Sequence, residues 1–96
     1  MTLVVTHLAR RDLDSISRYT LDNWGRKQLL HYVGGLMDRL DEIAANPEVG
    51  RNVAKVPVHY LRAQYRSHFI FYRIVSKDVH IIRILHQSMN AARHLN

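Results

Sequence analysis

The side chains best suited to chemistry in this chain are the arginines and histidines of its C-terminal half. Four arginines fall within or at the ends of stretches rich in β-branched and aromatic residues: Arg62, Arg66, Arg73 and Arg83. An arginine in such a stretch normally pairs with a carboxylate or reaches a ligand, and its planar fork fits phosphate. His86 ends the last stretch and could move a proton, so Arg62, Arg83 and His86 are a candidate set for RNA-cleaving phosphoryl transfer. A histidine at a strand end is nevertheless more often a structural hydrogen-bonding group than a catalyst.

Metal and nucleophilic chemistry find no support in the remaining residues. The seven histidines contain no His-Glu-x-x-His motif and no pair at the four-residue spacing of a helix. His80 and His86 could share a strand face, but two imidazoles without a third ligand make a weak metal site. Cysteine is absent, and no serine lies in a nucleophile-elbow sequence. We therefore expect no metal, no cofactor and no covalent catalysis.

The charge of the chain is unevenly distributed. The formal net charge is +6, from 14 basic and 8 acidic side chains. Up to Val49 there are six basic and seven acidic residues, whereas from Gly50 onward eight basic residues stand against Asp78 alone. A basic surface recruits an acidic partner, protein or nucleic acid, and speeds the encounter. The alternative is that these side chains form the solvated rim of a small domain.

A β-hairpin is predicted near the C-terminus. Its strands, 68–75 and 79–86, are separated only by the polar segment Ser76-Lys77-Asp78. Both strands are apolar on both faces, so they should be central in a sheet that is covered on two sides. Helices earlier in the chain can cover one side, and we expect a partner to cover the other. A three-residue turn would place Arg73 and Arg83 on one face of the hairpin, and a two-residue turn would place them on opposite faces.

The N-terminal half predicts a strand followed by two helices. Leu3 to Val5 form a short apolar run at or near a sheet edge, and Thr6 suits a helix N-cap. Apolar residues then recur at helical spacing over 8–24, and Gly25 suits the end of that helix. The second helix is predicted over 26–45.

Three positions in these helices carry specific expectations. Trp24 should close the corner between the two helices. Gly34-Gly35 should weaken the second helix by roughly 1 kcal/mol per glycine, unless the pair allows close approach of the neighbouring helix, which we favour. Asn46-Pro47 should end the second helix.

The rest of the chain completes an α+β layout. A segment over 53–56, interrupted by Pro57, is expected at a sheet edge, and 60–65 resumes an extended pattern. A short C-terminal helix capped by Ser88 should lie across the sheet edge. The predicted fold is therefore a two-helix N-terminal hairpin packed on a small, mainly antiparallel sheet, in the order β-α-α-β-β-β plus that short helix. We expect one cytoplasmic domain, 1–96, without a signal peptide or membrane span.

Several short sequence patterns resemble the RelE/ParE toxin superfamily, and its ParE branch more closely. They cover essentially the whole chain, and their order and spacing are more specific than any one of them alone. The patterns are the N-terminal strand followed by Ala9-x-x-Asp12-Leu13-x-x-Ile16, the Trp24-Gly25 corner, Asn46-Pro47 with Gly50-Arg51, Tyr60-Leu61-Arg62, Ser67 to Arg73 and Arg83 to Leu95.

The resemblance implies the toxin of a type II toxin–antitoxin system, held in a hetero-oligomer by a ParD-like antitoxin whose C-terminal segment wraps the helical hairpin and the sheet. ParE-branch toxins poison DNA gyrase and so stop DNA replication, whereas RelE-branch toxins are ribosome-dependent endoribonucleases that cleave messenger RNA. RelE-type nucleases use several basic residues plus a tyrosine or histidine near the C-terminus. Here Arg62 matches the family arginine and no tyrosine follows Tyr72, although His86 and His94 remain. A non-catalytic gyrase inhibitor is therefore favoured, with the nuclease as the alternative.

Two sets of contact residues are expected on this basis. The target-binding set combines basic residues with the C-terminal segment: Arg62, Arg66, Arg73, Arg83, Met89, Arg93 and His94. The antitoxin-binding set is apolar and comes from the helices and the central strands: Trp24, Leu30, Met37, Phe69, Phe71 and Ile82. Neither a membrane nor sequence-specific binding to nucleic acid is expected.

Overall fold

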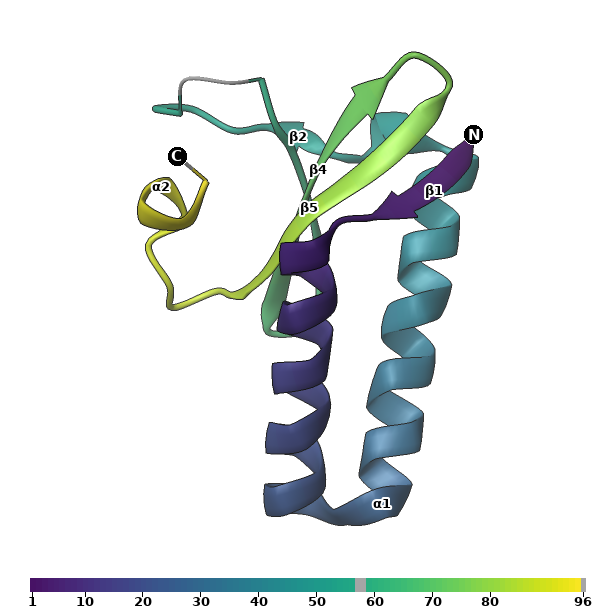
Figure 1. The fold of residues 1–96 in the computed structure, drawn as a ribbon, viewed down its shortest axis with the longest axis vertical. Coiled ribbons are helices and arrows are strands. Elements are labelled where there is room, and N and C mark those ends of the chain that lie inside the picture. The colour runs from purple at the N-terminus through teal and green to yellow at the C-terminus, as the bar shows by residue number, and fades with distance from the viewer. Residues whose placement is uncertain (57–58, 96) are drawn as a thin grey trace.

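Two layers, a helical hairpin and a five-stranded sheet, make up the computed structural model (Figure 1), which describes residues 1–56 and 59–95. The elements are β1 (Thr2–Val5), α1 (His7–Ala45), η1 (Pro47–Val49), β2 (Arg51–Asn52), β3 (Leu61–Tyr65), β4 (His68–Val75), β5 (Asp78–His86) and α2 (Ala91–His94). The strands lie in the order β1-β5-β4-β3-β2, with β1 parallel to β5 and the other pairs antiparallel. The predicted α+β fold is confirmed.

α1 is a helical hairpin because Gly25 divides it into a first limb, 7–24, and a second limb, 26–45. Gly25 has φ of +87° and ψ of 175°, a conformation that is essentially restricted to glycine. The chain reverses at this point, and the two limbs run side by side (Figure 1). At the start of the first limb, the Thr6 hydroxyl accepts a hydrogen bond from the Ala9 N–H at 3.3 Å, as its N-cap position predicts.

Close packing in the middle of the second limb involves the sheet rather than the first limb. A Cβ added at Gly35 would collide with the hydroxyl and ring of Tyr65 on β3, whereas a Cβ added at Gly34 would meet nothing. The Tyr65 hydroxyl also donates a hydrogen bond to the backbone oxygen of Tyr32 at 2.9 Å. A close approach therefore exists at Gly35, but the prediction that a helix makes it is wrong.

The main hydrophobic core lies between the helical limbs and the inner face of the sheet. Burying this apolar surface supplies the principal driving force for folding. The central position predicted for the β4–β5 hairpin is confirmed, because both strands contribute fully buried side chains. The buried members of the core are Ala9, Ile16, Leu36, Leu40, Ile43, Ala63, Ile70, Tyr72, Val79, Ile81 and Ile84.

The outer face of the sheet is covered by the chain's own C-terminal segment. Phe71 of β4 is only 1% exposed, and it forms a second buried cluster with Tyr60, Leu85 and Leu95. The Tyr60 hydroxyl donates a hydrogen bond to the backbone oxygen of Leu95 at 3.4 Å, which ties the end of the chain to this cluster. The prediction that this face stays open for a partner is therefore wrong for the free chain.

The β4–β5 hairpin differs from both predicted registers. The turn contains two residues, 76–77, but a β-bulge at Ile82 then shifts the pairing by one residue. Arg73 and Arg83 consequently share the outer face, which is the outcome predicted for a three-residue turn.

The C-terminal helix is shorter than predicted and has a different cap. Asn90 caps α2, since its side-chain oxygen accepts a hydrogen bond from the Ala92 N–H at 3.1 Å. Ser88 instead contacts His86, so its predicted role as the cap is wrong. Leu95 is buried, and α2 therefore lies against the outer face of the sheet rather than across its edge.

The edge of the sheet at β2 is also shorter than predicted. Arg51 and Asn52 form a two-residue strand, and the segment predicted as a strand over 53–56 is not one. Val53 and Val56 pack instead against the outer cluster of buried residues. The predicted interruption at Pro57 lies outside the described residues.

Candidate functional site

A groove opens where the helical hairpin extends beyond the sheet. The two limbs project past the strands (Figure 1), and the groove lies between them, the β3–β4 turn and the end of β5. Its volume is ≈ 860 Å³ and its surface is mainly apolar. We call it the hairpin groove. It is lined by Ser15, Ile16, Tyr19, Thr20, Trp24, Gln28, Tyr32, Ser67, His68, His86, Ser88 and Met89.

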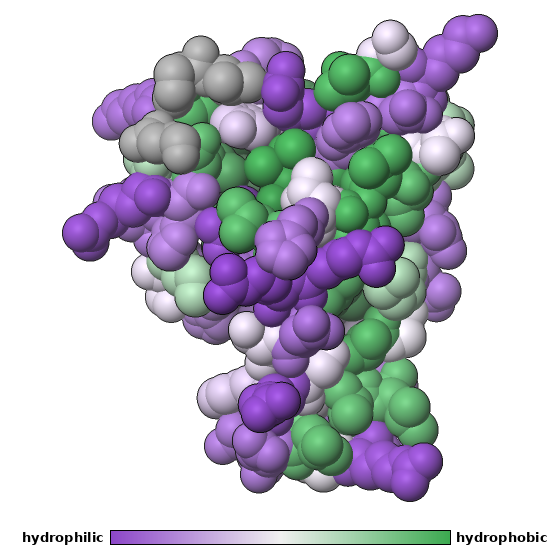
Figure 2. Space-filling view, viewed as in Figure 1, coloured by the Kyte–Doolittle hydropathy of each residue, from purple (hydrophilic) through white to green (hydrophobic). Residues whose placement is uncertain are grey.

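Large apolar side chains are exposed on both limbs of the helical hairpin. Trp24 is 69% exposed and Leu30 65% exposed, although tryptophan and leucine are normally well buried. Met37 is also exposed, and it shares a helical face with Leu30 because seven residues separate them. Figure 2 shows hydrophobic side chains at the surface over the free ends of the limbs. The prediction that Trp24 packs into the corner is wrong, and the exposed patch is instead typical of an interaction surface.

A short network of polar side chains forms one wall of the groove. The Tyr32 hydroxyl and His68 Nδ1 are 2.7 Å apart, and the rings of His68 and His86 meet edge to face with centroids 5.4 Å apart. The Ser88 N–H donates a hydrogen bond to His86 Nδ1 at 3.1 Å. A neutral His86 therefore carries its proton on Nε2.

The surroundings of His68 change its titration. Burial lowers the pKa of His68 below its ordinary value of 6.5, and the neighbouring His86 lowers it further. Asp12 acts in the opposite direction with a smaller effect. His68 is therefore neutral at pH 7 and fits its half-buried position beside Tyr32.

Asp12 and Arg83 join the first limb to the edge of β5. β1 pairs with β5 only as far as Ile81, so the β5 edge beyond it needs another hydrogen-bond partner. Asp12 Oδ2 accepts hydrogen bonds from the Ile84 N–H at 2.9 Å and from Arg83 Nε at 2.8 Å, and Oδ1 accepts one from Arg83 Nη2 at 2.9 Å. These hydrogen bonds raise the pKa of Arg83. The charge of Arg83 is thus largely neutralised within the protein.

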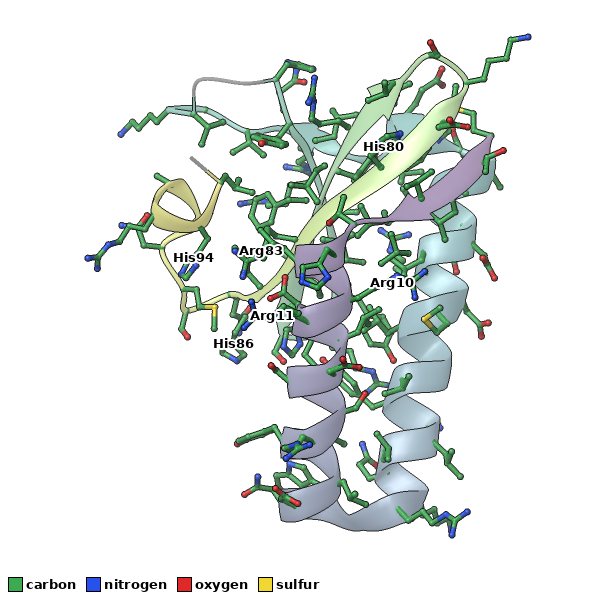
Figure 3. All side chains as sticks on the ribbon, in the orientation of Figure 1. Arg10, Arg11, His80, Arg83, His86 and His94 are labelled. Atoms are coloured by element: carbon green, nitrogen blue, oxygen red, sulfur yellow. The ribbon has the colours of Figure 1, made fainter. Side chains whose placement is uncertain are left out.

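The three candidate nuclease residues do not converge. Arg62 and Arg83 lie on the outer face, but β4 separates their strands, so their Cα atoms are about 10 Å apart. His86 points to the helix-facing side beside His68, and Figure 3 shows it near the far end of β5. His80 faces outward because the bulge lies between the two histidines, so their expected common face is wrong.

The other predicted target-binding residues fall into three groups. Arg62 and Arg73 are exposed on the outer face, and the Arg62 guanidinium lies 4.2 Å from the centre of the Phe69 ring. Met89 lines the hairpin groove, and the Arg66 guanidinium is 5.9 Å from the ring centre of Tyr32, which also lines it. The third group is on α2 and consists of Arg93 and His94.

The predicted antitoxin-binding residues divide between the two layers. Three are exposed on α1: Trp24, Leu30 and Met37. The other three belong to the outer face of the sheet, where Phe69 and Ile82 are half-buried and Phe71 is fully buried. A partner could reach the first three directly, but it could reach Phe71 only if the C-terminal segment moved.

Sequence reasoning assigned no role to Asp12, Tyr32 or His68. Asp12 lies on the same helical stripe as the buried residues Ala9 and Ile16, and an acidic residue on such a stripe indicates a paired carboxylate. Tyr32 and His68 are 36 residues apart, and no spacing rule connects them. Only the packing of the second limb on the sheet brings them together.

Two features are not found in the described part of the chain. Over residues 1–56 and 59–95, no three histidine or carboxylate side chains gather closely enough to hold a metal ion. Over the same residues, no helix combines the length and apolar composition that a bilayer crossing requires.

Two curated toxins are similar to this chain in sequence. Toxin ParE1 of Caulobacter vibrioides is 41% identical over 87 residues, which cover 91% of this chain and 90% of that protein. Toxin ParE1 of Mycobacterium tuberculosis is 34% identical over 88 residues, with coverage of 91% and 90%.

The fold also matches a solved structure described as the chromosomal ParDE TA system from P. aeruginosa. The TM-score is 0.78 at 21% identity, and the match covers 90% of this chain and 95% of the other, which supports the fold. The family model described as ParE toxin of type II toxin-antitoxin system, parDE, matches residues 3–91. The resemblance to the ParE branch is therefore confirmed, and the chain belongs to the ParE toxin family of type II toxin–antitoxin systems.

Proposed function

We propose that this ParE-family toxin stops growth by binding DNA gyrase, without catalysis of its own, and that a ParD-like antitoxin neutralises it in the cytoplasm. The observation that carries this proposal is the placement of the nuclease candidates. A nuclease needs a cationic group and a proton-transfer group within reach of one phosphate. Here Arg83 is paired with Asp12, and His86 points to the other side of the sheet from Arg62.

The hairpin groove supports the antitoxin part of the proposal. An amphipathic helix binds a protein by placing apolar side chains into an apolar groove. Trp24 lines such a groove, and Leu30 and Met37 are exposed on another face of the second limb. A net charge of +6 favours an acidic partner. We therefore propose that the antitoxin covers Trp24, Leu30 and Met37 first, with Phe69 and Ile82 at its margin.

The exposed cations support binding as the mode of action on the target. Arg66, Arg93 and His94 are exposed, and Met89 is an exposed side chain that lines the groove. Exposed cations and a polarisable side chain suit a protein interface, where arginine and methionine are enriched. We propose that these side chains contact gyrase.

Expression of single variants in growing cells separates this proposal from the nuclease alternative. The wild type and His86→Ala should both arrest growth, with double-strand DNA breaks and intact messenger RNA. Arg26→Ala, at the far end of the helical hairpin, serves as a control for loss of one positive charge. Transcripts cut in the wild type and left intact by His86→Ala would show a ribosome-dependent nuclease and contradict the proposal.

Co-purification with the cognate antitoxin tests the assignment of the groove. Trp24→Ala should weaken antitoxin binding by about 2 kcal/mol, because a tryptophan in a groove is a typical anchor residue. Ile74→Ala removes an exposed apolar side chain near the 76–77 turn and should leave binding within about 0.5 kcal/mol of the wild type. Equal effects of the two substitutions would exclude the groove as the antitoxin site.

A further inference from the structure

Three exposed arginines lie together on the outer face of the sheet, near its β2 edge. In the strand register Arg51 pairs with Arg62, and Arg62 pairs with Phe71. Residues paired across antiparallel strands share a face, so Arg51 and Arg62 both point outward. Arg73 lies two residues beyond Phe71 on the same face of β4 and is a diagonal neighbour of Arg62. We call Arg51, Arg62 and Arg73 the arginine row.

The fold gives no internal reason for this arrangement. Like charges directly opposite each other on neighbouring strands are destabilising. Within residues 1–56 and 59–95 the ion pairs are Arg39–Glu42 and Asp12–Arg83, so no member of the arginine row has a carboxylate partner there. Arg83, on the same face, is neutralised by Asp12. The chain therefore neutralises one outward arginine and leaves three others available.

Arg62 is also held in place for binding. Its guanidinium lies 4.2 Å from the centre of the Phe69 ring, within the range of a cation–π contact. Stacking fixes the plane of the guanidinium while its N–H groups stay free to donate, since the described hydrogen bonds do not use them. A group that is already ordered loses less conformational entropy when it binds an anion.

The chemistry of the surface favours a phosphate backbone over an acidic protein segment. A protein partner needs apolar contacts beside the charges, but on this face Phe71 and Leu85 are already buried under the C-terminal segment, Ile82 is half-buried, and Phe69 lies under Arg62. The apolar groove belongs to the other layer, around the ends of the helical limbs. Duplex DNA carries one negative charge per about 1.7 Å of helix axis, so several arginines can be satisfied at once without apolar contacts.

The same surface favours a duplex over a single strand. Binding of single-stranded nucleic acid depends on exposed aromatic rings on which bases stack. On this face Phe71 and Tyr60 are buried, and Phe69 lies under Arg62. We propose that the arginine row is a binding site for the phosphate backbone of duplex DNA, without base recognition.

Fluorescence anisotropy of the full-length chain with a labelled 20-base-pair duplex tests the site. Binding should weaken as NaCl rises from 50 to 200 mM, with a slope of roughly −2.7 for three phosphate contacts. The triple variant R51Q/R62Q/R73Q should lose affinity on the order of 100-fold at 50 mM NaCl and lose most of that slope. Its thermal midpoint should equal or exceed that of the wild type, because the substitutions remove a repulsion.

The triple variant R18Q/R26Q/K27Q is the matched control. It removes the same number of positive charges from exposed positions on α1. Its affinity for the duplex should stay within about threefold of the wild type, because screening limits the reach of each charge to roughly 14 Å at 50 mM NaCl. The assay contains no gyrase, so its result is independent of the target proposed above.

Four results would overturn the proposal. The first is that the wild type does not bind the duplex at 50 mM NaCl, and the second is that the two triple variants lose equal affinity for it. The third is that the wild type binds the corresponding single strand more tightly, and the fourth is that polyglutamate of equal charge displaces the duplex. The last result would identify an acidic polypeptide as the occupant.

Discussion

Replacing Asp12 by alanine should produce a large loss of stability, because one carboxylate makes three hydrogen bonds. It accepts two from Arg83 and one from the Ile84 N–H, all between 2.8 and 2.9 Å. The side chains of Arg83 and Asp12 are only 17% and 14% exposed. Without Asp12, a partly buried cation loses its partner and the β5 edge loses its acceptor.

The expected loss of stability for Asp12→Ala lies between the values known for buried and for exposed ion pairs. Removing one partner of a buried ion pair costs about 3–5 kcal/mol, and an exposed pair contributes about 0–1 kcal/mol. Because the Asp12–Arg83 pair is partly solvated, we expect Asp12→Ala to lower the free energy of unfolding by about 3 kcal/mol. For a chain of this length that corresponds to a fall of roughly 12–24 °C in the thermal midpoint. Asp12→Asn keeps an acceptor for the Ile84 N–H and should cost about half as much.

Urea denaturation followed by circular dichroism measures this loss. Glu42→Ala is the matched control, since it removes the carboxylate of the ion pair with Arg39, where Glu42 is 64% exposed. This control should change stability by less than about 0.5 kcal/mol. A double-mutant cycle with Arg83→Ala should give a coupling energy of about 1–2 kcal/mol with Asp12. A loss for Asp12→Ala no larger than that of Glu42→Ala would refute the reasoning.

Three further predictions concern backbone, packing and pH. Gly35→Ala should destabilise the chain by about 1–3 kcal/mol, because the added methyl group collides with Tyr65, whereas Gly34→Ala should stabilise it by up to about 1 kcal/mol. Chemical denaturation measures both changes, and changes of the same sign would contradict this contrast. Gly25→Ala should lower the free energy of unfolding by about 1–3 kcal/mol, because alanine is strained at a φ of +87° although there is space for its methyl group. An unchanged thermal midpoint would show that the corner between the limbs relaxes without strain. Because the pKa of His68 is lower in the folded state, its contribution to stability should be complete above pH 6.5 and should decline as the pH falls below 6.5, by at most about 1.4 kcal/mol per pH unit. His68→Gln should therefore flatten the fall in thermal midpoint between pH 7.5 and pH 5.5, and a curve identical to that of the wild type would contradict the assignment.

The elements that sequence predicted best are those with strong local signals. Gly25 interrupts a helical pattern at the point where α1 needs a positive φ, so the two limbs were predictable. The hairpin strands were predictable as central because both of their faces are apolar. In each case the deciding information lies within a few residues of the element.

The features that sequence did not predict depend on distant contacts. The bulge at Ile82 has no marker such as a glycine, yet it decides which face carries Arg83. The burial of Phe71 depends on Leu95, 24 residues away, which follows a helix of only four residues. Apolar residues on both faces of a strand therefore correctly indicated that both faces are covered. They did not indicate that the chain's own C-terminal segment covers the outer face.

The candidate site was predictable in its residue types and less so in its geometry. Trp24, Leu30 and Met37 were expected to be contact residues, and the structure exposes all three. Arg62, Arg83 and His86 were proposed as one candidate set from their residue types, but the side of the sheet on which each lies follows from the register and the bulge. The neutralisation of Arg83 by Asp12 required knowledge of where the first limb crosses β5.

A supercoiling assay with purified gyrase, relaxed plasmid and ATP tests the central claim most directly. If the toxin acts by binding, inhibition should reach its maximum when toxin and gyrase are near equal concentration, and linear plasmid should accumulate. The same preparation should leave messenger RNA intact on translating ribosomes. Cleavage of that RNA by toxin at far below the ribosome concentration, with supercoiling unaffected by excess toxin, would contradict the account.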